Sequence, residues 1–128
     1  KVYYDATKRG ILVNVVDRPE FCSFIVPATI NRGDLSISIS TGGASPALAR
    51  NIRERLEKQF GDEYGEFAKL LSETRRKILS EVSDESIRRD ILQRIAGLDM
   101  LEIVKQKGIA EARKKILGII SEEIGKGR

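Results

Sequence analysis

The stretch that decides the predicted fold is Ile11–Arg50, which reads ILVNVVDRPEFCSFIVPATINRGDLSISISTGGASPALAR. Its first residues, Ile11–Val16, are apolar apart from Asn14, as in a parallel strand that helices cover on both faces. Before it, Val2–Lys8 has the pattern of a helix that stops at Gly10. This order of helix and buried strand predicts part of an α/β sheet.

That sheet cannot be complete within this sequence. A βαβ unit needs roughly 30 residues, whereas ten residues precede Ile11. We therefore expect the remaining strands to lie upstream of Lys1 or in another chain.

A hairpin is predicted after the turn at Asp17–Glu20. Ser23–Ile30 mixes apolar and small residues and contains Pro27, which favours an edge strand or a bend. Asn31–Asp34 has turn composition. In Leu35–Ser40, apolar residues alternate with serines, which is the period of a half-buried strand. Its short polar face suits packing against a backbone or a ligand.

From Thr41 onward the sequence predicts helices. Ser45 is a good N-cap and Pro46 suits the first helical position, where its missing N–H costs nothing. One apolar stripe at a spacing of four ends at Gly61, and it consists of Leu48, Ile52, Leu56 and Phe60. Further helices are predicted around Tyr64–Ile78, Ser83–Ile95, Leu98–Lys107 and Ile109–Ile124.

Composition excludes several kinds of chemistry. The 128 residues have the length of one domain, and no apolar run approaches the roughly 20 residues that span a bilayer. With one cysteine and no histidine, Cys/His metal cages and Ser-His-Asp triads are excluded, so we expect no protein-bound metal. Cys22 is interpreted as a small buried hydrophobe in a reducing cytoplasm, with a reactive thiol as the lesser alternative.

The basic charge does not by itself indicate nucleic acid. The net charge is +4, but 23 basic and 19 acidic residues are interleaved, which is typical of solvated helix faces. Aromatic content of 5% makes a base-stacking platform a poor fit. A nucleic-acid-binding helical domain is the weakest of three hypotheses, while attraction to a small polyanion stays open.

Asp17 is the first candidate site residue. It follows directly on the predicted buried strand, and ligands of open α/β sheets bind beyond the carboxyl ends of strands. A carboxylate there can hydrogen-bond a ligand or act as a general base. Equally, Asp17 can cap the turn before Pro19, and position alone does not separate these alternatives.

The second candidate is the glycine-rich loop. Gly42 and Gly43 precede a helix N-terminus, where unpaired backbone N–H groups can hold a carboxylate or phosphate. The alternative is that the turn needs glycine only for its backbone geometry. Arg50, about one and a half turns into the helix, favours the anion site.

Two motifs carry a resemblance to a known family. VNVVDRPEFCSFIVPA at Val13–Ala28 and ISTGGASPALAR at Ile39–Arg50 resemble the siroheme synthase family, and the helical remainder extends the resemblance over nearly the whole chain. These are precorrin-2 dehydrogenases, some of which are also sirohydrochlorin ferrochelatases. The resemblance implies homodimers that oxidise precorrin-2 with NAD to sirohydrochlorin during siroheme biosynthesis.

The resemblance also implies a domain plan and a mixed α/β and α fold. Residues 1–22 would be the C-terminal edge of a Rossmann-like NAD domain. Residues 23–46 would be dimerisation strands with the glycine-rich loop, and residues 47–128 a helical domain. From the lone cysteine, the lack of a long apolar run and the interleaved charges, we expect a cytoplasmic protein with no membrane or nucleic-acid partner.

Site roles carry over by motif. The resemblance implies that Asp17 transfers protons in the dehydrogenation and in metal insertion. The residues that it assigns to the tetrapyrrole cleft are Thr41, Gly42, Gly43 and Ser45, and Arg50 would pair with the substrate's carboxylates. Val16 would contact the edge of the NAD site.

Two departures from the family pattern limit what this polypeptide can do alone. The glycine-rich dinucleotide fingerprint is absent, so we expect an inactive fragment of a longer enzyme that does not hold NAD by itself. The lack of histidine makes dehydrogenation the safer expectation and leaves insertion of Fe2+, as chelatase substrate, open. The rival hypothesis is a non-catalytic module for homodimerisation or tetrapyrrole binding.

Overall fold

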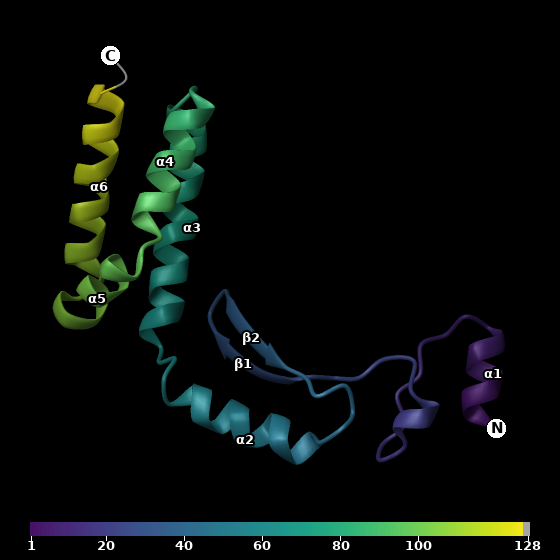
Figure 1. Ribbon diagram of the computed structural model, residues 1–128. Coiled ribbons are helices and arrows are strands. Elements are labelled where there is room, and N and C mark those ends of the chain that lie inside the picture. Colours follow the sequence, from purple (N-terminus) through teal and green to yellow (C-terminus); the bar gives the residue numbers. More distant parts are fainter. Residues whose placement is uncertain (127–128) are drawn as a thin grey trace. The chain divides into compact units, whose positions relative to one another are not determined.

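The computed structural model describes residues 1–126 and divides into two compact units (Figure 1). The N-terminal unit comprises Lys1–Ile30 and Ser36–Gln59. The helical unit comprises Asn31–Leu35 and the chain from Phe60 onward. No helix within residues 1–126 combines the length and the apolar character that crossing a membrane requires.

The N-terminal unit combines short helices with most of a two-stranded hairpin. Its elements are α1 (Val2–Lys8), the 3-10 helix η1 (Pro19–Phe21), β1 (Ala28–Arg32), β2 (Leu35–Ile39) and α2 (Pro46–Glu57), with the hairpin turn contributed by the helical unit. The rings of Tyr3 and Phe21 lie 5.5 Å apart and so hold α1 against η1. The predicted first helix and the hairpin are confirmed.

The predicted strand Ile11–Val16 is wrong. The segment forms no strand, and the exposed fractions of Ile11, Leu12 and Val16 are 56%, 71% and 80%. A parallel strand exists only where neighbouring strands pair with its backbone. Among residues 1–126 the only sheet is the β1–β2 hairpin, so an apolar sequence alone does not make this segment a strand.

The first hairpin strand begins later than expected. β1 starts at Ala28, directly after Pro27, because proline has no N–H to donate to a ladder. Asn31 and Arg32 therefore belong to the strand, and Gly33, at a φ of +58°, makes the turn. In β2 the predicted alternation is confirmed, with the serines on the exposed face.

Helix α2 begins as predicted, but a different face is buried. The Leu48 N–H donates to Ser45 Oγ at 3.2 Å, which confirms the cap. Leu48 and Ile52 are 51% and 37% exposed, whereas Ala49 is 6% exposed. A row at a spacing of four drifts by about 40° at each step around a helix, so the expected stripe does not stay on one face.

The helical unit matches the sequence expectation closely. It contains α3 (Glu63–Glu81), α4 (Glu85–Ile95), α5 (Leu98–Lys107) and α6 (Ile109–Lys126). The Ile87 N–H donates to Asp84 Oδ1 at 2.9 Å, so Asp84 caps α4. All four helices contribute to one core, which includes Leu70, Ile78, Ile91, Ile95, Met100, Leu101, Val104, Ala112, Ile116 and Ile120.

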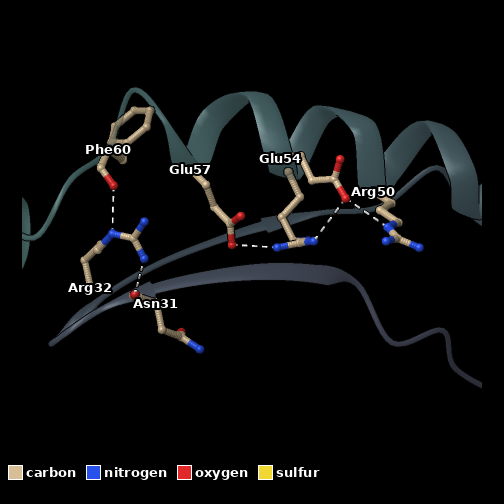
Figure 2. Close-up of polar contacts among 7 residues, drawn as sticks. Asn31, Arg32, Arg50, Glu54, Glu57 and Phe60 are labelled. Atoms are coloured by element: carbon tan, nitrogen blue, oxygen red, sulfur yellow. Dashed lines mark hydrogen bonds and ion pairs between the residues drawn. The ribbon is translucent and has the colours of Figure 1, made fainter.

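Within this unit, the hairpin turn lies directly on the start of α3. Arg32 Nε donates to the Phe60 carbonyl at 2.7 Å, and Arg32 Nη1 donates to the Asn31 carbonyl at 2.9 Å (Figure 2). A Cβ on Gly65 would lie 2.8 Å from the backbone carbon and oxygen of Arg32. The two backbones can approach this closely only because residue 65 has no side chain.

We expect Gly65→Ala to destabilise the helical unit by roughly 1–3 kcal/mol, because backbone atoms must move to admit the methyl group. The matched control is Gly118→Ala in α6, where an added Cβ meets nothing within 4 Å. That control should stabilise by about 0.5–1 kcal/mol, since alanine is the better helix former. Denaturant unfolding measures both, and equal effects of the two substitutions would contradict the close contact.

An ion pair joins α3 to α6, and its effect on a pKa can be tested. Arg113 Nη2 lies 2.9 Å from Glu73 Oε2, and this hydrogen bond lowers the pKa of Glu73 below its ordinary 4.5. Because the folded-state pKa is lowered, the pair stabilises the fold above pH 4.5, and this contribution is lost as the pH falls through the folded-state pKa. We expect Arg113→Gln to return the pKa of Glu73 toward its ordinary value in an NMR titration, while Lys114→Gln leaves it lowered.

Candidate functional site

Asp17 lies in a tight turn with an uncommon backbone conformation. The Arg18 N–H donates to the Val15 carbonyl at 3.2 Å, which closes a turn over Val16 and Asp17. The φ of Asp17 is +59°, and among residues 1–126 no other non-glycine residue has a positive φ. A positive φ at this place is typical of a type II turn, where glycine or asparagine is usual. The structure thus gives Asp17 a special backbone geometry.

The neighbouring charges are engaged with each other. Arg18 Nε lies 2.5 Å from Glu20 Oε1, and this hydrogen bond lowers the pKa of Glu20. The Arg18 guanidinium carbon also lies 4.9 Å from the centre of the Phe21 ring. Arg18 is therefore directed toward η1.

Side chains from the following segment hold the residues before Asp17. The Val15 N–H donates to Cys22 Sγ at 3.2 Å, and the Val13 N–H donates to Ser23 Oγ at 2.6 Å. The Ser23 N–H returns a hydrogen bond to the Val13 carbonyl at 2.8 Å. These bonds give Val13–Val15 the backbone partners that a sheet would otherwise supply.

The glycine-rich loop satisfies most of its own N–H groups. The Gly42 N–H donates to Ser40 Oγ at 3.2 Å, and the Ala44 N–H donates to the Thr41 carbonyl at 3.1 Å. The Ser45 N–H donates to Thr41 Oγ1 at 3.0 Å. The expectation that this loop presents its N–H groups to an anion is therefore wrong for these three groups. Their internal bonds instead shape the loop before any ligand binds.

Gly43 is the point where the loop meets the Asp17 segment. Its φ is +85°, and a Cβ added there would lie 3.2 Å from Ile25 Cδ1 and 3.4 Å from Pro19 Cβ. Both the backbone conformation and the available space therefore favour glycine. The backbone-geometry reading of this glycine has structural support.

Two adjoining cavities, each of about 240 Å³, lie along this contact. The aspartate cavity is lined by Asn14–Pro19 and Cys22, and the hairpin cavity by Pro27, Ala28, Ile39–Thr41 and Ala49. Both are also lined by Ile25, Val26, Gly43 and Pro46. Asp17 and the glycine-rich loop, far apart in the sequence, thus border one continuous set of walls.

The structure brings together some of the predicted site residues and not others. Asp17, Val16 and Gly43 line the aspartate cavity, while Thr41 and Gly43 line the hairpin cavity. Gly42 and Ser45 shape the loop without lining either cavity.

Arg50 also lines neither cavity. Its Nε donates to Glu54 Oε1 at 2.9 Å, and its side chain is 74% exposed (Figure 2). Any role for Arg50 toward an anion stays a prediction, because this contact directs its guanidinium along the helix.

Sequence reasoning missed the apolar walls of the cavities. Ile25 and Val26 line both, and they are 41% and 70% exposed. Their signal is the apolar run before Pro27, which was assigned to strand packing. An apolar wall beside one carboxylate suits a large, flat and partly charged ligand.

The described residues supply no nucleotide cradle and no metal cluster. Residues 1–126 contain no group of three or more His, Cys, Asp or Glu side chains that could hold a metal ion. They also lack a glycine-rich turn between a parallel strand and a helix, which is the element that binds a dinucleotide's pyrophosphate. We therefore derive no step through NAD from these residues.

The turn geometry predicts how substitutions of Asp17 affect stability. Asp17→Asn should change the free energy of unfolding by no more than about 0.5 kcal/mol, because asparagine tolerates a positive φ. Asp17→Val should lose roughly 1–2 kcal/mol, because a β-branched residue is strained there. Thermal and denaturant unfolding test the pair, and a harmless valine would contradict the positive φ.

Family models match the two halves of the N-terminal region. A model described as putative NAD(P)-binding matches residues 1–28, and one described as sirohaem biosynthesis protein central matches residues 32–59. The first includes Asp17 and the wall residues Ile25 and Val26, and the second contains the glycine-rich loop. The two cavities are thus built from both matched regions.

Curated relatives include several siroheme synthases. The chain is 38% identical over 112 residues to the siroheme synthase of Methylococcus capsulatus, covering 88% of this chain and 23% of that protein. It is 30% identical over 127 residues to that of Photobacterium profundum, covering 99% of this chain and 27% of that protein. The chain spans about a fifth of the length of the curated relatives it matches.

A solved structure shows the same fold. The chain matches SirC, precorrin-2 dehydrogenase, with a TM-score of 0.66 and 28% sequence identity, over 78% of this chain and 47% of that one. This match supports the predicted fold class, a dinucleotide-domain edge and hairpin followed by helices. In sequence and in fold, the chain is therefore a homologue of a segment of the siroheme synthases, and the resemblance to that family is confirmed.

Proposed function

We propose that this chain is part of an enzyme of siroheme biosynthesis that oxidises precorrin-2 to sirohydrochlorin with NAD. One observation supports this most directly. Asp17 and the glycine-rich loop, which the resemblance assigns to catalysis and substrate binding, border the same adjoining cavities. Similarity to siroheme synthases and to SirC supports the reaction class.

The oxidation removes a hydride and a proton from the tetrapyrrole. The residues of this chain can accept the proton. Asp17 lines its cavity beside apolar side chains such as Val26, so a carboxylate oxygen can accept a proton from a bound macrocycle. Each cavity alone is smaller than the roughly 300–1,000 Å³ of typical ligand pockets. We expect the substrate to extend across both, with the rings along Ile25 and Val26.

NAD would be held mainly by residues other than those described. When bound, it supplies a hydride acceptor. Val16 is 80% exposed and lines the aspartate cavity, so it is the residue that we propose as a contact at the edge of the nucleotide site. We retain Thr41, Gly42, Gly43, Ser45 and Arg50 as proposed substrate-binding residues.

Several further properties belong to the same proposal. We propose a cytoplasmic homodimer with the domain limits 1–22, 23–46 and 47–128. The exposed apolar residues Leu48 and Ile52 on α2 support burial of that face in an assembly. Insertion of Fe2+ into sirohydrochlorin is the second activity that the family resemblance leaves open, with iron as substrate.

The alternative is a non-catalytic module that dimerises or binds a tetrapyrrole. This alternative needs only the two adjoining cavities and no bound nucleotide. Both functions use the same cavities, so they differ only in whether Asp17 takes part in chemistry.

The test is Asp17→Asn in the whole protein that contains this chain. We expect precorrin-2 oxidation to fall by about 10²–10⁴-fold, because the amide cannot accept the proton, while tetrapyrrole binding is retained. Asp34→Asn, in the hairpin turn and outside both cavities, is the matched control and should keep full turnover. Unchanged turnover in Asp17→Asn would exclude Asp17 from the mechanism and leave the binding module.

A further inference from the structure

The backbone at Asp17 requires support from the surrounding structure. A non-glycine residue at a φ of +59° is in a sparsely populated region, which persists where neighbouring contacts hold it. The backbone bond from the Arg18 N–H to the Val15 carbonyl closes the turn. The side chains of Cys22 and Ser23 add further contacts to it.

Cys22 contacts the backbone on both sides of Asp17. Its Sγ accepts the Val15 N–H at 3.2 Å and lies 3.4 Å from the carbonyl oxygens of Val15 and Arg18. A thiol is both a weak acceptor and a weak donor, so one sulfur atom can hydrogen-bond to the backbone before and after Asp17. Cys22 thus spans the turn whose third residue is Asp17.

Ser23 holds the chain one step further back. Its Oγ accepts the Val13 N–H at 2.6 Å, and its own N–H donates to the Val13 carbonyl at 2.8 Å. Ser23 lines neither cavity, so its contacts act on the backbone and not on a ligand. We refer to the two side chains and their backbone bonds as the Cys22–Ser23 clasp.

We propose that Cys22 and Ser23 are positioning residues that hold the Asp17 carboxylate at the cavity. The proposal rests on the catalytic role of Asp17 proposed above. Hydrogen bonds from the clasp act together with the backbone bond from Arg18 to Val15 and give the Asp17 turn one conformation. Substituting Ser23 would let the carboxylate move without removing a cavity-lining group, whereas Cys22 also lines the aspartate cavity.

A positioning role has a distinct kinetic signature. A displacement of about 1 Å in a catalytic group can lower the rate by roughly 100-fold. Ser23 lines neither cavity and Cys22 lines only the aspartate cavity, whereas Ile25, Val26 and Gly43 line both, so substrate binding should persist. Weakening the clasp should therefore lower kcat much more than it changes KM.

The experiment uses the whole protein with Ser23→Ala, Cys22→Ala and the conservative Cys22→Ser. Ser80→Ala is the control, because it also removes a hydrogen bond between a serine side chain and the backbone, the donation of Ser80 Oγ to the Lys77 carbonyl at 2.8 Å, but within α3. Two quantities are measured for each variant: kcat and KM for precorrin-2 oxidation, and the exchange rates of the Val13 and Val15 amides by NMR. Asp17→Asn is run beside them as the reference.

We expect Ser23→Ala and Cys22→Ala to lower kcat by about 10–100-fold with little change in KM. Val13 should exchange faster in the serine variant and Val15 in the cysteine variant, while Ser80→Ala changes neither quantity. Cys22→Ser, which keeps a donor and an acceptor, should recover most of the rate.

Two results overturn the proposal in different ways. If Asp17→Asn lowers turnover but the clasp variants keep full kcat, the turn holds without the clasp and the positioning role is wrong. If Asp17→Asn itself keeps full turnover, the proposed function fails, and the catalytic role of the clasp fails with it. Loss of kcat in Ser80→Ala would show a general structural effect and would also overturn the assignment.

Discussion

The contact of Gly43 with Pro19 and Ile25 is the constraint on which the candidate site depends. A Cβ at Gly43 would meet both side chains within 3.4 Å, and its φ is +85°. Because this residue has no side chain, the glycine-rich loop can lie against the segment that carries Asp17. The two cavities share Gly43 and Pro46 from the loop side and Ile25 and Val26 from the other side. The glycine at position 43 thus allows two motifs that are far apart in the sequence to lie in contact.

Stability and function draw on different parts of the chain. The helical unit has a continuous apolar core, with residues such as Ile91 and Met100 fully buried. In the N-terminal unit, the Asp17 turn is held by hydrogen bonds from Cys22 and Ser23. An uncommon backbone conformation persists where surrounding contacts hold it, and at the proposed site residue Asp17 hydrogen bonds supply these contacts.

Local signals predicted much of the architecture. The cap at Ser45 and the alternation in β2 were confirmed, because each depends on residues near in sequence. The strand at Ile11–Val16 was wrong, since a strand requires partners that no local pattern contains. The buried face of α2 was also misplaced, because packing partners decide which face of a helix is covered.

The sequence by itself determined the helices, the cap at Ser45, the hairpin and the family resemblance, since all of these follow from residue types at short and regular spacings. It also singled out Asp17 and the glycine-rich loop. Only the tertiary structure decided that Asp17 has a positive φ, that the loop uses up three of its own N–H groups, and that Arg50 pairs with Glu54. Each of these depends on distances between atoms that sequence spacing does not specify, because hydrogen bonds form wherever the folded backbone brings donor and acceptor together.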